Sequence, residues 1–212
     1  MKARSALLGA ASAGPLLAVR RWSRSWGSTP AERSAALPGD DLVPDPVTSV
    51  TRSVTVDVPA ERVWPWLVQM GQGRGGMYSY DRLENAIGLD IHSATHIDPR
   101  WQHLDVGDRV VLVRQGWPVI PQGFSLPVAA VEPGHHLVLR QTPEEHGWDA
   151  TWAFVLQPDG PSRCRLITRS RSAGIRAEPG WVVRLLDEVM SPVQFVMERR
   201  MLLGIKQRAE ST

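Results

Sequence analysis

A glycine-rich loop with two tyrosines is the part of the chain best suited to chemistry. Residues 69–81 read Gln-Met-Gly-Gln-Gly-Arg-Gly-Gly-Met-Tyr-Ser-Tyr-Asp. Its glycines allow positive φ angles and a close approach of the backbone to a ligand, and its polar and aromatic side chains could bind one. The ligand-binding candidates are Trp64, Trp66, Gln69, Arg74, Tyr78 and Tyr80. A tight connection in which Arg74 is satisfied internally explains the same residues equally well.

The loop also fits the dinucleotide-binding pattern Gly-x-Gly-x-x-Gly at residues 71–76, and Asp90 follows at close to the usual distance of about 20 residues. That pattern functions after a strand of a parallel βαβ unit. Here the preceding segment has helical spacing and contains Pro65, which a central strand does not tolerate. We therefore expect no nucleotide cofactor, and no other cofactor is indicated.

Titratable side chains are densest just after this loop. Asp90, His92, His96 and Asp98 could supply part of a metal site, but the chain has no His-Glu-x-x-His motif and no cysteine pair, so we expect no metal. His92 beside a carboxylate could act as a general acid or base, because histidine exchanges protons near neutral pH. The catalytic candidates are Tyr78, His92 and Arg74. A capped helix followed by a solvated loop is the alternative.

Cys164 and the arginines around it read as structural. Arg163 and Arg165 flank Cys164 in a predicted strand, and side chains alternate across a strand, so both arginines point away from the sulfur. We expect Cys164 to be a small apolar residue that faces the core or a cavity. Arg163, Arg165, Arg169 and Arg171 then form a row on one face of the sheet, which we expect to be the outer surface. No Gly-x-Ser-x-Gly motif supports an α/β-hydrolase.

The elements that position these residues follow from hydrophobic periodicity. Residues 50–58 alternate apolar and polar side chains, as in a strand with one buried face, and Arg52 at an inward position suits an edge strand. Residues 59–70 have helical spacing, and Leu83 and Ile87 at i and i+4 predict a second short helix. Further strand-like runs, close enough in sequence to pair antiparallel, cover residues 109–114, 124–131, 137–141, 150–156 and 164–170.

After Gly180 the apolar residues are spaced for a long amphipathic helix of about 28 residues, which Pro192 either kinks or restarts. Met197 and Met201 on this helix are further ligand-binding candidates. Glu198 either faces inward, paired with a charge from the first helices, or lies on a solvated face. A curved sheet buries such a helix by wrapping around it. We expect an α+β fold in which a curved antiparallel sheet wraps a long C-terminal helix.

The order of elements, together with Val-Asp-Val-Pro-Ala-Glu-Arg-Val-Trp-Pro-Trp-Leu at residues 56–67, resembles the START-like, or Bet v 1-like, superfamily of SRPBCC proteins over residues 47–209. Residues 69–81 and 195–206 resemble motifs of an uncharacterised bacterial subgroup of these proteins. The resemblance implies the helix-grip fold, with a cavity between the sheet and the C-terminal helix that takes lipids, sterols, polyketides or hormones. It also implies kinship with polyketide cyclases and dehydratases, since some members are such enzymes.

Residues 1–46 read as an N-terminal extension. Residues 6–19 are apolar but shorter than the about 20 residues of a membrane-spanning helix, and the apolar run is too short for a usual signal peptide. Arginines and tryptophans in residues 20–26 suit a membrane interface, so residues 6–26 could contact a membrane; a tail packed on the domain is the alternative. Thr29-Pro30-Ala31-Glu32 is a capping box that predicts a short helix to about Leu37, followed by a proline-rich linker along the surface.

Composition narrows the classes of protein. The chain has 212 residues, 42% of them hydrophobic and 22% charged, as in a globular domain. One cysteine excludes a disulfide-framed fold. The 24 Lys and Arg against 22 Asp and Glu leave a net charge of +2, which argues against nucleic-acid binding. We expect a cytoplasmic protein, with membrane association as an alternative, and the oligomeric state stays open.

The sequence predicts the binding or transport of a hydrophobic or amphipathic small molecule in an internal cavity, without covalent chemistry. The expected ligand is of the lipid, polyketide or isoprenoid class. One alternative is an enzyme of cyclase or dehydratase type, in which Tyr78, Arg74 and His92 polarise a carbonyl and move a proton. A third reading is a membrane-associated interaction protein.

Overall fold

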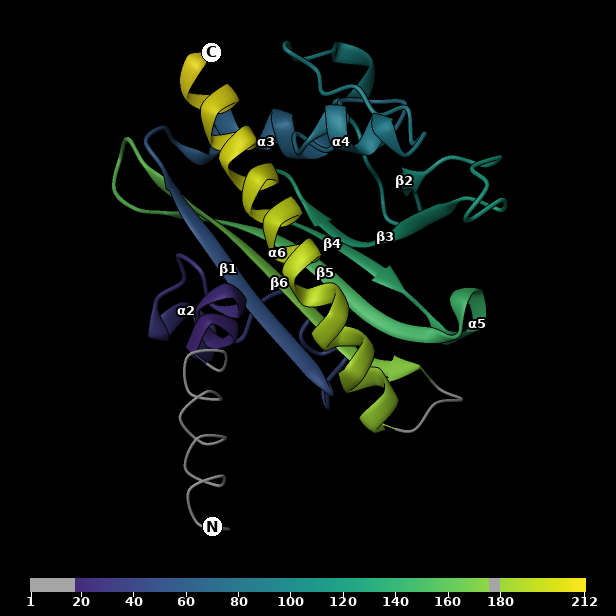
Figure 1. Cartoon of the computed structure of the whole chain (residues 1–212). Coiled ribbons are helices and arrows are strands. Elements are labelled where there is room, and N and C mark those ends of the chain that lie inside the picture. Colours follow the sequence, from purple (N-terminus) through teal and green to yellow (C-terminus); the bar gives the residue numbers. More distant parts are fainter. Residues whose placement is uncertain (1–17, 176–179) are drawn as a thin grey trace, which may run out of the picture.

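A six-stranded antiparallel sheet and one long helix dominate the computed structural model, which describes residues 18–175 and 180–212. The sheet has the strand order β1-β6-β5-β4-β3-β2, and α6 (Gly180–Ser211) crosses one face of it (Figure 1). The strands are β1 (Thr48–Val56), β2 (Arg109–Val113), β3 (Phe124–Glu132), β4 (His136–Gln141), β5 (Trp148–Pro158) and β6 (Cys164–Ile175). This arrangement confirms the predicted helix-grip fold.

The strands pair as their alternation predicts. In the β1–β6 register Val56 lies opposite Cys164 and Arg52 lies opposite Thr168, so these residues share the face that α6 covers. β1 pairs with β6 alone, which makes it an edge strand and gives the inward Arg52 the place expected for it. Cys164 is fully buried in the core. The prediction of an apolar role for this cysteine is confirmed.

Three short helical segments lie at one end of the sheet. They are α3 (Ala60–Val68), α4 (Asp81–Ala86) and η1 (Pro99–Trp101). α3 follows Pro59, continues through Pro65, and buries Val63, Trp66 and Leu67. These side chains join Met201, Leu202 and Ile205 of α6 in the main core. The sequence analysis did not anticipate η1 or the four-residue helix α5 (Pro143–His146).

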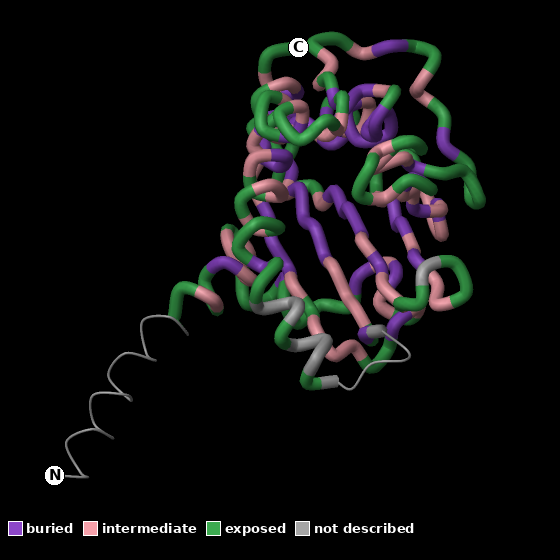
Figure 2. Tube along the Cα trace, turned by 45° about the vertical axis from the view of Figure 1, so that its right-hand side comes forward, coloured by how far each residue is buried: buried purple, intermediate pink, exposed green. Residues whose placement is uncertain are grey.

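The two halves of α6 differ in burial. The C-terminal half contributes Met201, Leu202 and Ile205 to the core, whereas in the first half the apolar residues at positions 181–193 whose burial is described are exposed (Figure 2). Trp181, Leu185 and Val189 are 68%, 55% and 66% exposed, and they follow one another at intervals of four residues. Four-residue spacing places them along one side of the helix. We refer to these residues, with Val193 and Val196, as the apolar stripe.

The N-terminal segment runs from α6 to the outer face of the sheet: Trp22 and Trp26 contact Phe195 of α6, and residues 32–43 pack on the face opposite α6. Residues 18–24 are helical, and α2 (Pro30–Ser34) begins with the predicted capping box, in which Glu32 N donates to Thr29 Oγ1 over 3.1 Å. α2 ends at Ser34, before the expected end near Leu37, and Leu37 instead packs with Val155 and Ile167 of the sheet. The first part of this segment, residues 1–17, lies outside the described residues.

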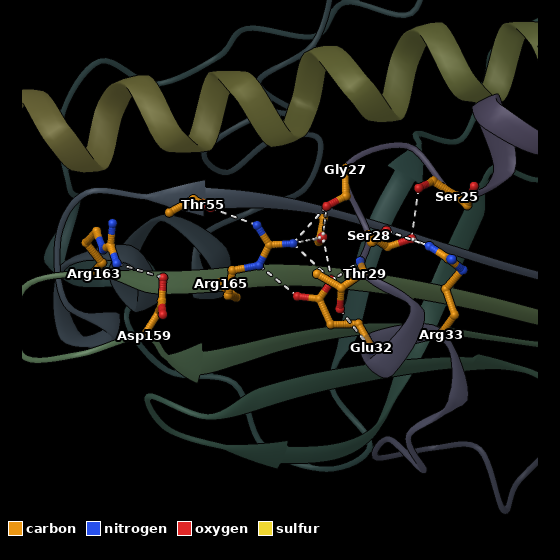
Figure 3. A network of polar contacts seen from close by, with 11 residues as sticks. Ser25, Gly27, Ser28, Thr29, Glu32, Arg33, Thr55, Asp159, Arg163 and Arg165 are labelled. Atoms are coloured by element: carbon orange, nitrogen blue, oxygen red, sulfur yellow. Dashed lines mark hydrogen bonds and ion pairs between the residues drawn. The ribbon is translucent and has the colours of Figure 1, made fainter.

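The arginine row is covered by this segment and not exposed to solvent, which corrects the sequence prediction. Arg165 Nε donates to Glu32 Oε1 over 2.7 Å (Figure 3), and Arg169 pairs with Asp40 over 2.6 Å. Arg171 Nε donates to the carbonyl oxygen of Val43 over 2.9 Å. Arg163 keeps an exposed position beside Asp159. Arg165, Arg169 and Arg171 can be covered because the N-terminal extension supplies carboxylates and backbone carbonyls that accept hydrogen bonds from their guanidinium groups.

Candidate functional site

A cavity of about 470 Å³ lies between the inner face of the sheet and α6. Pockets that hold small molecules have volumes of about 300–1,000 Å³. Most of the wall is apolar and comes from β1 to β6, the glycine-rich loop and α6. The apolar lining includes Phe124, Leu126, Leu139, Trp152, Met197 and Met201.

Strand register explains why these residues share one wall. Leu139 of β4 lies opposite Trp152 of β5, Trp152 lies opposite Ser170 of β6, and Ser170 lies opposite Val50 of β1. Directly opposed residues of neighbouring strands point to the same face. All four line the cavity, so one row across the sheet forms its floor.

A buried ion pair closes part of the cavity. Arg52 of β1 binds Glu198 of α6, and their side chains are 3% and 11% exposed. Glu198 also accepts a hydrogen bond from the Thr168 hydroxyl, and Arg52 Nε donates to the Ser23 carbonyl over 2.8 Å. Glu198 therefore faces inward, but its partner comes from β1 and not from the first helices. Of the neighbouring helix arginines, the Arg199 guanidinium lies 5.0 Å from the centre of the Trp26 ring.

Glu84 of α4 is a cavity residue that the spacing of apolar residues does not predict. Its side chain lines the cavity, the residue is 4% exposed, and Oε2 has no hydrogen-bond partner among the described residues. Burial, with the charge of Asp81, raises the pKa of Glu84, and the Ser79 hydroxyl opposes that shift. The spacing of Leu83 and Ile87 suggested the opposite helix face, but those two side chains are 59% and 58% exposed.

Trp152 brings a second polar atom without a partner to the cavity. Its Nε1 is buried and makes no hydrogen bond within the described part of the chain. The indole packs against Phe154 with ring centres 4.7 Å apart. An alternating strand predicts an inward tryptophan at this place, but the sequence could not show that its N–H lacks an acceptor.

Of the predicted ligand-binding residues, Met197 and Met201 line the cavity, together with Met77 and Ser79 of the glycine-rich loop. Trp64, Trp66, Gln69, Arg74, Tyr78 and Tyr80 do not belong to the lining.

Gln69, Tyr78 and Trp66 are brought together, but in the core beside the cavity. Gln69 Nε2 lies 3.0 Å from the Tyr78 hydroxyl, and Gln69 Oε1 accepts from the Asp98 backbone over 3.0 Å. The Trp66 and Tyr78 rings meet edge to face at 5.9 Å. Burial raises the pKa of Tyr78 to about 12, although the Gln69 hydrogen bond and two arginines oppose it. These contacts hold the glycine-rich loop to α3.

Arg74 connects the end of α3 to η1. Its guanidinium donates to the carbonyl oxygens of Val68 and Trp101 over 3.1 and 2.9 Å. Burial lowers the pKa of Arg74, with Asp108 and Tyr78 opposing. The arrangement matches the tight connection with an internally satisfied arginine.

His92 lies apart from the other two catalytic candidates. Its side chain is 78% exposed and faces Asp90, with 3.1 Å between Nε2 and Oδ1. The backbone of Gly76 packs closely against that of His92. A Cβ atom at residue 76 would lie 2.5 Å from the His92 carbonyl oxygen. Tyr78, Arg74 and His92 are thus not assembled into one site.

Within residues 18–175 and 180–212, no group of three or more His, Cys, Asp or Glu side chains is arranged to hold a metal ion. No helix in these two ranges combines the length and the apolar character needed to cross a bilayer.

No protein-family model matches this chain, and no curated protein matches it. Solved structures do match, at low identity. Protein MLL2253 from Mesorhizobium loti is 16% identical, with a TM-score of 0.43, over 78% of this chain and 98% of its own. Norcoclaurine synthase from Thalictrum flavum is 11% identical, with a TM-score of 0.44, over 76% and 91%. The di-domain ARO/CYC BexL of the BE-7585A biosynthetic pathway is 10% identical, with a TM-score of 0.42, over 77% and 46%. Likenesses at this level carry no argument about function.

Proposed function

We propose that this protein binds or transports a hydrophobic or amphipathic small molecule in the cavity between the sheet and α6, without covalent chemistry. The cavity itself is the observation that carries the proposal. Its volume suits a small molecule, and its wall is mainly apolar with a few polar groups, as in known ligand pockets. Lipid, polyketide and isoprenoid molecules have this chemistry.

The cavity reaches the surface beside the first half of α6. Met190 of α6 and Trp148 of β5 both line it, and they are 48% and 40% exposed. A ligand can therefore enter between the start of β5 and α6 without passing through the core.

The cyclase or dehydratase alternative has less support from the geometry. Proton transfer requires groups within hydrogen-bond reach of each other or of one water. Tyr78 and Arg74 are used in internal hydrogen bonds, and His92 faces solvent. The constellation predicted for catalysis is not formed.

The binding proposal is tested by native mass spectrometry of the purified protein, followed by extraction and by titration with the neutral dye Nile red. We expect a retained apolar molecule or saturable dye binding. Ala150→Trp, which fills the cavity, should abolish binding, whereas Ala36→Trp on the exposed N-terminal segment should not. A wild-type protein that retains nothing and does not bind the dye would overturn the proposal.

We propose as a second function that the protein contacts an anionic lipid surface. Trp22 is 53% exposed at its contact with Phe195 of α6, and the apolar stripe continues along that helix. A second hollow is lined by Arg20, Arg21, Arg24 and Arg33. Arginines beside exposed aromatic and aliphatic side chains suit the headgroup region of a membrane.

Flotation with vesicles separates this second function from the first. We expect binding to vesicles that contain phosphatidylserine and weaker binding to phosphatidylcholine alone. Leu185→Glu in the apolar stripe should reduce flotation, whereas Leu83→Glu, an equally exposed leucine on α4, should not. Figure 1 shows α4 and the start of α6 at opposite ends of the molecule. Absence of flotation by the full chain would contradict this function.

A further inference from the structure

We infer that the cavity selects a neutral, oxygen-bearing ligand, which hydrogen-bonds to Trp152 and Glu84, and that it discriminates against carboxylate anions. This inference rests on the proposed binding function and adds the chemical class of the ligand. Three observations carry it: a donor without an acceptor, a carboxyl oxygen without a partner among the described residues, and arginines that are already paired.

The Trp152 indole supplies the donor. An indole nitrogen can donate one hydrogen bond and accepts none. Burial of an N–H without an acceptor is unfavourable, so a ligand that brings an oxygen to Nε1 gains from satisfying it. Trp152 lies in the row of residues that forms the cavity floor, so its side chain faces the cavity.

Glu84 supplies the second group, from α4 and not from the sheet. Oε2 is buried at the cavity wall and has no partner within the described residues. Burial and the neighbouring Asp81 carboxylate favour the neutral form of this carboxyl group, as the direction of its pKa shift indicates. A neutral carboxyl group both donates and accepts, which matches a ligand hydroxyl or carbonyl.

The arginines of the described lining are not free to receive an anion. Arg52 binds Glu198 inside the cavity. Arg171 also contributes to the lining, but its guanidinium bonds the carbonyl oxygens of Val43 and Pro44 on the outer face. A ligand carboxylate would be buried without a cation of its own, which is strongly unfavourable.

Dodecanol, dodecanoate and dodecylamine form a matched set of probes for this inference. The full chain is titrated with each probe near neutral pH, and binding is measured by calorimetry and by displacement of Nile red. Dodecanol should bind at least about tenfold more tightly than dodecanoate. Dodecanoate or dodecylamine binding as tightly as dodecanol would overturn the inference but leave the binding function standing. If neither Nile red nor any of the three probes binds, the binding function itself fails.

Substitutions then test the two anchors. Trp152→Phe keeps an aromatic ring without the N–H, and Glu84→Leu keeps the bulk without the oxygens; each should weaken dodecanol binding about tenfold. Glu84→Gln, which keeps a donor and an acceptor, should lose less than Glu84→Leu.

Two control variants match these changes away from the cavity. They are Trp66→Phe, where Nε1 also lacks a partner, and Glu61→Gln on the exposed face of α3. Thermal melts identify a variant that does not fold. In that case the inference is tested by the selectivity of the wild-type protein among the three probes. Folded Trp152→Phe and Glu84→Leu variants with wild-type affinity for dodecanol would overturn the inference.

Discussion

Arg52 of the edge strand β1 and Glu198 of α6 form an ion pair that joins the sheet to the helix it wraps. Both side chains are almost completely buried, and each has a second hydrogen bond, Arg52 to the Ser23 carbonyl and Glu198 from the Thr168 hydroxyl. Removing one partner of such a pair leaves an uncompensated buried charge. The pair therefore links three parts of the chain: the N-terminal segment, the sheet and α6.

We expect Glu198→Ala to lower the free energy of unfolding by about 3–5 kcal/mol in urea titrations, because Arg52 is left buried without its carboxylate. The double variant Arg52→Met with Glu198→Leu should recover a large part of this loss. Arg163→Met is the control: it breaks the exposed contact with Asp159 and should change the same quantity by less than about 1 kcal/mol. Equal effects of Glu198→Ala and Arg163→Met would contradict the role of the buried pair.

Glu32 should make the stability of the protein depend on pH. Burial by itself raises the pKa of Glu32, but hydrogen bonds from Arg165 and the Thr29 backbone outweigh burial and leave the pKa below the ordinary value of 4.5. A carboxyl group with a lowered pKa in the folded state stabilises the protein above its unfolded pKa. That contribution is lost as the pH falls below about 4.5 and through the folded value.

The measurement is the free energy of unfolding of wild type and Glu32→Gln between about pH 7 and about pH 3. The wild type should be the more stable of the two near neutral pH, and the difference should shrink in the acidic part of the range. Parallel curves over the whole range would show that Glu32 does not contribute in this way.

Cys164 should be unreactive in the folded protein. Burial raises the pKa of its thiol to about 11, with the charge of Glu61 adding to the shift and Lys206 opposing it. The thiolate is the reactive species, so both its low population and its burial protect this cysteine. Labelling with a chromogenic disulfide reagent at pH near neutral should be slow in buffer and rapid in denaturant. Rapid labelling in buffer would mean that the core around β6 opens readily.

Gly204→Ala should destabilise the protein, against the usual preference of helices. In an exposed helix, alanine is more stable than glycine by about 1 kcal/mol. At Gly204 of α6, a Cβ would lie 3.0 Å from Tyr78 Cβ and closer still to the Tyr78 carbonyl oxygen. Overpacking of this kind costs about 1–3 kcal/mol, which thermal melts would detect. Gly73→Ala, where no atom lies within 4 Å, tests a positive φ without a clash, and an equal loss there would count against the packing argument.

The strands were predictable because alternation encodes which side of a sheet is buried. Arg52 shows this well: its inward register follows from the valines around it, and its edge position follows from the charge. The helix α4 was predicted with the wrong buried side. Leu83 and Ile87 are exposed, whereas Glu84 is buried and forms part of the cavity wall. A six-residue helix offers too few positions for hydrophobic periodicity to show which of its sides is buried.

The site was less predictable than the fold. Met197 and Met201 were found because a long helix has a regular buried side, whereas the roles of Trp152 and Glu84 depend on what surrounds their polar atoms. Arg74 has a residue type that suits either a ligand or its own backbone, and the sequence does not distinguish the two. Only tertiary contacts show that one nitrogen of its guanidinium group already donates to two backbone carbonyls.

The docking of the N-terminal segment also constrains the order of events during folding. Glu32 precedes its partner Arg165 by 133 residues, and Asp40 precedes Arg169 by 129. The segment therefore leaves the ribosome long before β6 exists to receive it. Its ion pairs close some of the longest loops in the chain, and loops of that length form slowly. We therefore expect the outer face of the sheet to be covered late in folding, by the part of the protein that is synthesised first.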